Sequence, residues 1–121
     1  MSFLYNQIRV QLMKLKDMLK NLKYTGKIDE REINGITHDS RKVKDGTLFI
    51  AIKGQNSDGY EFIPSAIERG ASAIIANGRT TKITGIPVVH VADTREAMSH
   101  VAANFYGRPS EDMSIVGITG T

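Results

Sequence analysis

The chain contains no cysteine and no tryptophan, and its apolar residues never form a long uninterrupted run. Without cysteine, a disulfide framework, a thiolate nucleophile and a cysteine-ligated zinc site are excluded. No stretch approaches the roughly 18 apolar residues that a membrane-spanning helix needs, and no basic segment followed by an apolar core marks a secretion signal. We therefore expect a cytoplasmic protein with no membrane span.

Length and composition favour one folded domain. The chain has 121 residues, of which 40% are hydrophobic and 24% charged, as in typical globular proteins. The net charge is +3, yet residues 1–27 hold six basic residues against one acidic residue. The rest of the chain has ten basic and twelve acidic residues. The pI of 9.3 therefore describes one segment, and it is weak evidence for a nucleic-acid partner.

Residues 1–24 have the pattern of an amphipathic helix. Apolar side chains recur at three- and four-residue steps with lysines between them, at Leu4, Ile8, Leu12, Leu15, Leu19 and Leu22. Met13 offers a second start, so residues 1–12 are either an extension of the domain or the product of an upstream initiation. The basic helix also allows an alternative function, a module that binds nucleic acid or a protein partner. Because the lysines are scattered and no arginine cluster accompanies them, a solvated helix face is favoured.

Apolar strands alternate with amphipathic helices along the rest of the chain. We expect strands over residues 33–37, 47–52, 71–76, 87–91 and 113–118, and helices over residues 62–70 and 93–107. The run 47–52 is continuously apolar and should be buried on both faces of a sheet. The alternation predicts an α/β domain, a small mixed or mainly parallel sheet flanked by helices and preceded by the amphipathic N-terminal helix.

The helix predicted over residues 93–107 has a clear start signal. Asp93 and Glu96 are spaced as a capping box, in which the aspartate accepts a hydrogen bond from an N–H group in the first turn. The apolar face expected on this helix consists of Ala97, Met98, Val101, Ala102 and Phe105. Gly107 should end the helix.

Polar segments follow the first two predicted strands, His38 to Arg41 after one and the loop Gln55-Asn56-Ser57 after the other. Ligands of open α/β sheets favour the carboxyl ends of strands. A serine hydroxyl and a guanidinium suit a phosphate, and the amides of Gln55 and Asn56 suit the edge of a base. The alternative is a surface turn in which Asp39 caps its own backbone and pairs with Arg41, and spacing alone favours that alternative.

The chain ends in Gly117-Ile118-Thr119-Gly120-Thr121, directly after a predicted strand. Phosphate loops begin in this way, because glycine lets backbone N–H groups approach phosphate oxygens. The lysine and the following hydroxyl residue that hold the terminal phosphates and magnesium are missing. From spacing alone an ordinary turn is the simpler interpretation, and the chain is not expected to hydrolyse ATP.

Other chemistries find little support. The three histidines lie on different predicted elements, without a carboxylate at ligand spacing, so no metal site is predicted. No motif brings a serine, a histidine and an aspartate together as a catalytic triad. The four tyrosines are too dispersed to stack single-stranded bases. We therefore predict no catalytic residue, no metal ligand and no nucleic-acid partner.

Several motifs together resemble the N-terminal region of the Mur ligases, which build the peptide of peptidoglycan. The motifs are Thr37 to Arg41, Asp45 to Ala51, Gly54, Asp58-Gly59, Phe62-Ile63, Ala66-Ile67 and Gly70-Ala71. The segments Phe105 to Ser110 and Val116 to Thr121 look like the MurE type, which adds the third amino acid. The MurF type, which shares some of these motifs, is the alternative.

The resemblance implies a domain organisation: residues 25–112 would form the N-terminal UDP-binding domain, and residues 113–121 would begin the central ATP-binding domain. The residues implied to contact the UDP end of UDP-N-acetylmuramoyl-L-alanyl-D-glutamate are His38, Ser40, Gln55, Asn56 and Ser57. Asp39 and Arg41 would shape the corner.

The resemblance also implies the parent reaction, ATP-dependent amide formation with magnesium. Gly120 and Thr121 would open the ATP loop, and the remaining Mur ligase domains would supply the catalytic groups. The chain alone is therefore expected to bind the nucleotide substrate without turnover. A folded unit with no ligand of its own is the remaining alternative.

Overall fold

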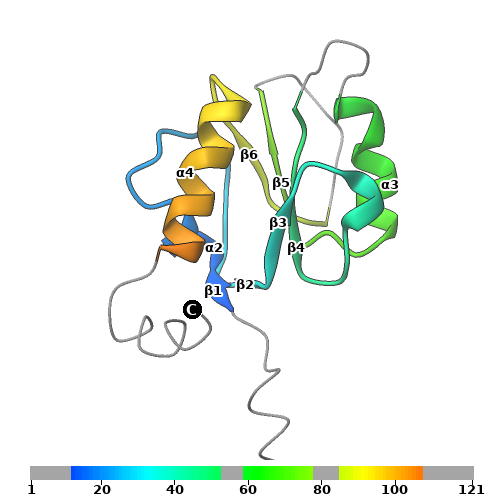
Figure 1. The fold of residues 1–121 in the computed structure, drawn as a ribbon, viewed down its shortest axis with the longest axis horizontal. Helices are drawn as coiled ribbons and strands as arrows, with labels where there is room; N and C mark the ends of the chain where they lie inside the picture. Colours follow the sequence, from blue (N-terminus) through cyan, green and yellow to red (C-terminus); the bar gives the residue numbers. More distant parts are fainter. Residues whose placement is uncertain (1–11, 53–58, 78–84, 108–121) are drawn as a thin grey trace, which may run out of the picture.

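The computed structural model describes residues 12–52, 59–77 and 85–107 (Figure 1). Its elements, in chain order, are β1 (Met13–Lys14), α2 (Leu15–Met18), β2 (Glu32–Ile33), β3 (Gly35–Thr37), the 3-10 turn η1 (Ser40–Lys42), β4 (Thr47–Ile50), the 3-10 turn η2 (Gly59–Phe62), α3 (Ile63–Glu68), β5 (Ala73–Ala76), β6 (Val88–His90) and α4 (Thr94–Tyr106). The predicted strand over residues 113–118 lies outside the described residues.

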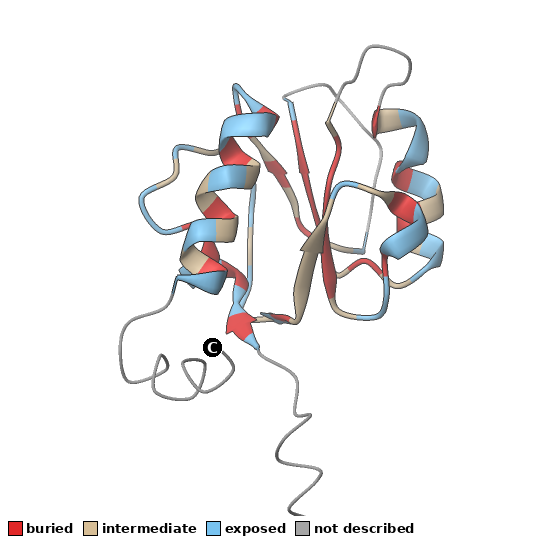
Figure 2. Ribbon diagram, in the orientation of Figure 1, coloured by how far each residue is buried: buried red, intermediate tan, exposed pale blue. Residues whose placement is uncertain are grey.

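The centre of the fold is a parallel sheet with the strand order β3-β4-β5-β6. In its register Ile36 pairs with Leu48, and Ile75 pairs with both Ile50 and Val89. Figure 1 shows α4 and α2 over one face of the sheet and α3 over the other. Every residue of β4 and β5 is therefore buried, as Figure 2 shows. The predicted α/β class is confirmed, and the sheet is parallel.

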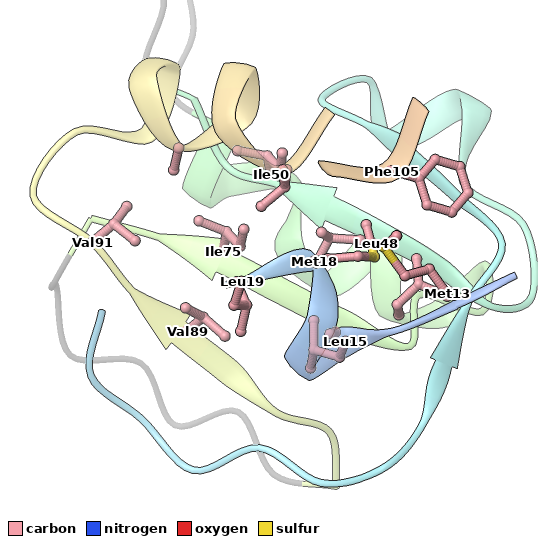
Figure 3. Packing of buried hydrophobic residues seen from close by; sticks show 14 residues of the cluster. Met13, Leu15, Met18, Leu19, Leu48, Ile50, Ile75, Val89, Val91 and Phe105 are labelled. Carbon is pink, nitrogen blue, oxygen red and sulfur yellow. The ribbon is translucent and has the colours of Figure 1, made fainter. Parts of the chain in front are cut away.

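Alternate residues of each strand enter two separate cores, because successive side chains point to opposite faces. On the α4 side, Leu48, Ile50, Ile75 and Val89 of the sheet belong to one buried cluster with side chains of α2 and α4 (Figure 3). The other cluster joins sheet residues to α3, and its buried members are Val43, Phe49, Ala51, Ile63, Ala66, Ala71, Ile74 and Ala76. The sheet is thus stabilised by apolar burial on both faces.

The capping signal correctly locates the start of α4. Asp93 Oδ1 accepts hydrogen bonds from the N–H groups of Arg95 and Glu96, at 3.0 and 3.1 Å. The helix closes where the N–H of Gly107 donates to the carbonyl of Ala103, at 2.8 Å. Its buried residues are Thr94, Ala97, Val101 and Phe105, which face the sheet at helical spacing.

The prediction of a long N-terminal helix is wrong over its described part. Met13–Lys14 is a strand, antiparallel to β2, and Leu15–Met18 is a single helical turn. Asn21 has a left-handed backbone, with φ of 69°. The leucine periodicity has a different cause here, because Leu15 and Leu19 bury against the sheet from one turn (Figure 3). Residues 1–11 lie outside the described residues.

The strand predicted over residues 33–37 is divided at Asn34 between two sheets. The backbone N–H of Asn34 donates to the carbonyl of Gly46 at 2.9 Å, and the Asn34 side-chain amide donates to the carbonyl of Asp45 at 2.7 Å. Asn34 thereby anchors the Asp-Gly turn before β4 and separates β2 from β3.

Among the described helices, none has the length and apolar content needed to cross a membrane.

Two neighbouring aromatic residues of α4 test the packing account. Phe105 is 2% exposed and Tyr106 is 58% exposed, with their rings edge to face at 4.8 Å. Phe105→Ala should lower the free energy of unfolding by about 3–5 kcal/mol, through lost burial and a cavity. Tyr106→Ala should lower the free energy of unfolding by less than about 1.5 kcal/mol, because this side chain is exposed and loses only its edge-to-face contact with Phe105. Urea unfolding followed by circular dichroism measures the free energy of unfolding of both variants. Equal decreases for the two variants would contradict the packing described for α4.

Candidate functional site

A pocket of about 870 Å³ opens at the carboxyl edge of the sheet. Its lining residues come from the segments after β3 and β4, from η2 and from one face of α4. They are His38, Asp39, Ser40, Arg41, Ile52, Gly59, Phe62, Arg95, Met98, Ser99 and Ala102. The volume falls in the range of small-molecule sites, which is roughly 300–1,000 Å³.

Local hydrogen bonds fix the turn that follows β3. The hydroxyl of Thr37 accepts from the N–H of Asp39 at 3.0 Å. The Asp39 carboxylate accepts from the N–H of Arg41 at 3.0 Å and from its guanidinium Nε and Nη2 at 3.1 and 2.9 Å. Asp39 therefore caps the turn and pairs with Arg41, as the surface-turn alternative predicted. The same contacts shape the pocket corner and present His38 and Ser40 to it.

The Asp39–Arg41 pair also sets the charge of this corner. The guanidinium of Arg41, and then its backbone N–H, lower the pKa of Asp39 from 3.8 to about 2. Asp39 is consequently ionised at neutral pH, and its negative charge offsets the positive charge of Arg41. The corner thus offers polar groups with little net charge of its own.

Gly59 brings the chain back beside the end of β4. Its N–H donates to the carbonyl of Ile52 at 3.0 Å. A Cβ atom at Gly59 would lie 2.5 Å from the backbone nitrogen of Ile52, so a larger residue would force the two segments apart. This close approach positions Phe62 and Ile52 in the pocket lining. Gln55, Asn56 and Ser57 lie outside the described residues.

Helix α4 contributes a wall of the pocket that was not predicted from the sequence. Met98 and Ala102 were expected in the core face of the helix. Both are half-buried and line the pocket, and Met98 also packs against the core cluster on this side of the sheet. Arg95 and Ser99 were not predicted as site residues at all. A signal existed in their spacing, because positions 95, 98, 99 and 102 share one helix face beside the buried stripe.

In the described ranges, no group of three or more histidine, aspartate or glutamate side chains is placed to hold a metal ion. His100 instead contacts the carbonyl of Lys20 through Nε2 at 2.7 Å, while His38 lies at the pocket and His90 lies on β6. Gly120 and Thr121, expected to open an ATP loop, lie outside the described residues.

A parallel sheet with a polar and apolar pocket at its carboxyl edge is the arrangement in which open α/β domains hold their ligands. Residues 32–106 match the family model described as "Mur ligase family, catalytic domain". This match covers more than half of the chain. The chain therefore belongs to the Mur ligase family.

Curated relatives point to the MurE type within that family. The chain is 52% identical over 91 residues to a UDP-N-acetylmuramoyl-L-alanyl-D-glutamate--2,6-diaminopimelate ligase of Geobacter sulfurreducens, covering 75% of this chain and 18% of the relative. A relative of the same name from Clostridioides difficile is 46% identical over 111 residues, covering 90% and 23%. The chain thus spans about a fifth of the length of these relatives.

The solved structures agree with the fold. A crystal structure of MurF from Acinetobacter baumannii matches with a TM-score of 0.69 at 25% sequence identity. The match covers 80% of this chain and 22% of the MurF chain. The α/β fold with flanking helices is therefore shared with another Mur ligase type.

The paired corner makes a pH-dependent prediction. Because the folded-state pKa of Asp39 is lowered, the contribution of this pair to stability is present above about pH 4 and is lost as the pH falls toward 2. A titration of the side-chain carboxyl carbons by NMR should give Asp39 a pKa of about 2. Arg41→Ala should raise the pKa of Asp39, because it removes the guanidinium that lowers it.

Asp29 provides the internal control, since Arg31 holds its pKa at about 2 outside the pocket. Arg41→Ala should leave the pKa of Asp29 unchanged. An ordinary pKa for Asp39 in the unmodified protein, or an equal change at both aspartates, would contradict the pairing.

Proposed function

We propose that this chain is the UDP-recognition domain of a MurE-type, ATP-dependent peptidoglycan ligase. Its substrate would be UDP-N-acetylmuramoyl-L-alanyl-D-glutamate, held by the UDP end. The observation that carries the proposal is the pocket at the carboxyl edge of the sheet, in which His38 and Ser40 face α4. The names of the relatives support the choice of substrate.

The chemistry of the lining suits a nucleotide. Ile52, Phe62, Met98 and Ala102 give the pocket an apolar part, which can cover a base or a ribose. Hydroxyl, imidazole and guanidinium groups are suited to hydrogen bonding with phosphate and base oxygens. We assign UDP contacts to His38 and Ser40 and, on the basis of the resemblance, to Gln55, Asn56 and Ser57. Asp39 and Arg41 position the corner.

The domain would contribute binding energy rather than a catalytic group. A nucleotide held far from the reacting carboxylate fixes the position of that carboxylate, and binding energy is converted into orientation. In the proposed organisation residues 25–112 form this domain, and residues 113–121 begin the ATP-binding domain. ATP and magnesium then belong to the larger cytoplasmic enzyme, and the 121-residue chain alone is inactive.

The added amino acid is also part of the proposal. The relatives from Geobacter sulfurreducens and Clostridioides difficile are both named as 2,6-diaminopimelate ligases. We extend that specificity to the parent enzyme of this chain. Because the specificity for the added amino acid belongs to the whole enzyme, the full-length ligase must be assayed. The test compares amide formation with diaminopimelate and with lysine as the added amino acid.

Titration of isotopically labelled protein with UDP tests the binding proposal. Amide signals of residues 38–41, of Gly59 and of residues 95–102 should shift as the pocket fills. An absence of shifts at millimolar UDP would contradict the proposal. Shifts confined to residues remote from the pocket would contradict it equally.

A matched pair of serine variants locates the site. Ser40→Ala removes a hydroxyl at the pocket and should weaken UDP binding by roughly threefold to tenfold, the worth of one hydrogen bond. Ser72→Ala changes a half-buried serine outside the pocket lining and should leave the dissociation constant unchanged. Isothermal titration calorimetry measures both values, and equal effects would count against the assigned site.

A further inference from the structure

Helix α4 presents side chains to three different surroundings. Its buried stripe, which includes Val101, meets the sheet. The residues that line the pocket, among them Met98 and Ala102, lie on one flank of this stripe. With 3.6 residues per turn, His100 and Asn104 lie on the opposite flank. The helix can therefore hold a second element on the side away from the pocket.

The element on that side is the end of the short helix α2. The Asn104 side-chain amide donates hydrogen bonds to the carbonyls of Met18 and Lys20, at 2.8 and 3.1 Å. His100 Nε2 lies 2.7 Å from the same Lys20 carbonyl. Because a carbonyl only accepts, Nε2 carries the proton and donates it. These partners are 80 to 86 residues apart in the sequence, so the contacts join distant parts of the chain.

Helix α2 depends on these contacts for its own C-terminal end. It has four residues, too few for a helix to be stable by itself. The last carbonyls of a helix have no partner within the helix, and Met18 supplies one of them. After Lys20 the chain turns at Asn21, whose φ is 69°. The side chains of α4 thus cap α2 from outside.

Apolar packing joins the same two helices. Met18 is fully buried and Leu19 is 2% exposed, and both belong to the cluster that contains Val101 and Phe105 (Figure 3). In a densely packed core, one of these helices cannot shift without displacing the other. The α2 segment precedes residues 32–106, the range of the family match. A segment outside that range therefore contacts the helix that forms a pocket wall.

We infer that Asn104 and His100 are positioning residues, which fix α4 to α2 so that its opposite flank stands in place as the pocket wall. Neither residue lines the pocket. Loss of their hydrogen bonds should let α4 shift and should alter the pocket without removing any group from it. The effect on UDP affinity rests on the proposed function, whereas the effect on the ligand-free pocket does not.

Asn104→Ala tests the inference, because it removes the donors to Met18 and Lys20 and leaves the pocket lining intact. In the ligand-free variant the methyl NMR signals of Met98, on the α4 wall, and of Ile52, after β4, should both move. The dissociation constant of UDP should rise by about threefold to tenfold, since a smaller fraction of the protein then has the wall in place. Isothermal titration calorimetry measures the dissociation constant.

Arg31→Ala is the matched control, because it also removes a side-chain hydrogen bond to a distant backbone carbonyl. Arg31 Nη1 donates to the carbonyl of Ser72 at 2.9 Å, just before β5 and outside the pocket lining. This variant should lose stability, as Asn104→Ala does, but should leave the methyl signals of Met98 and Ile52 and the dissociation constant of UDP unchanged. Thermal unfolding measures the stability of each variant. If Asn104→Ala does not fold, His100→Ala provides the same measurements, because it leaves the hydrogen bonds of Asn104 in place.

The outcomes separate this inference from the proposed function. Unchanged methyl signals in Asn104→Ala would overturn the inference, because α4 would then keep its place without the contact to α2. Equal changes in Asn104→Ala and Arg31→Ala would overturn it as well, since they would reflect a general loosening of the fold. If the unmodified protein does not bind UDP, the proposed function fails, and the methyl signals of the ligand-free variants still decide the inference.

Discussion

The parallel pairing of β3 with β4 is the constraint on which the rest of the structure depends. Parallel strands send their carboxyl ends to one edge of a sheet, so the segments after Thr37 and Ile50 emerge side by side. Parallel sheets must also be covered on both faces, and α4 and α3 provide that cover. Packing of α4 against the sheet then places its pocket-lining residues, among them Met98, Ser99 and Ala102, at the same edge. The pocket is thus a consequence of how the sheet is buried.

The two walls of the pocket differ in how they are held. The turn after β3 is organised locally, because Asp39 accepts hydrogen bonds from the backbone and side chain of Arg41. The α4 wall is organised by tertiary packing, because Val101 and Phe105 lock the helix against the sheet. A ligand placed between them would meet a polar corner on one side and a helix face with both polar and apolar side chains on the other. This asymmetry suits a molecule with a base at one end and phosphates at the other.

The sequence predicts the fold where local and tertiary preferences agree. The apolar run 47–52 correctly locates the buried strand Thr47–Ile50, and the cap at Asp93 correctly locates a helix start. Prediction fails at Met13, where pairing with Ile33 overrides a helical leucine pattern. It is incomplete at Met98, which packs against the core as expected but also lines the pocket, because periodicity identifies an apolar face without telling which part of it meets a pocket. The Asp39–Arg41 turn was predicted in part, as an alternative favoured by spacing.

The central claim is that a uridine nucleotide occupies the pocket between the His38 corner and α4. Intermolecular nuclear Overhauser effects in a sample with labelled methionine, alanine and isoleucine methyl groups test it most directly. The account predicts contacts from uracil or ribose protons to the methyl groups of Met98 and Ala102, and none to the buried Met18. A smaller cleft elsewhere on the surface is lined in part by Ile28 and Ile86. Contacts to these two residues, with none to Met98 or Ala102, would contradict the claim.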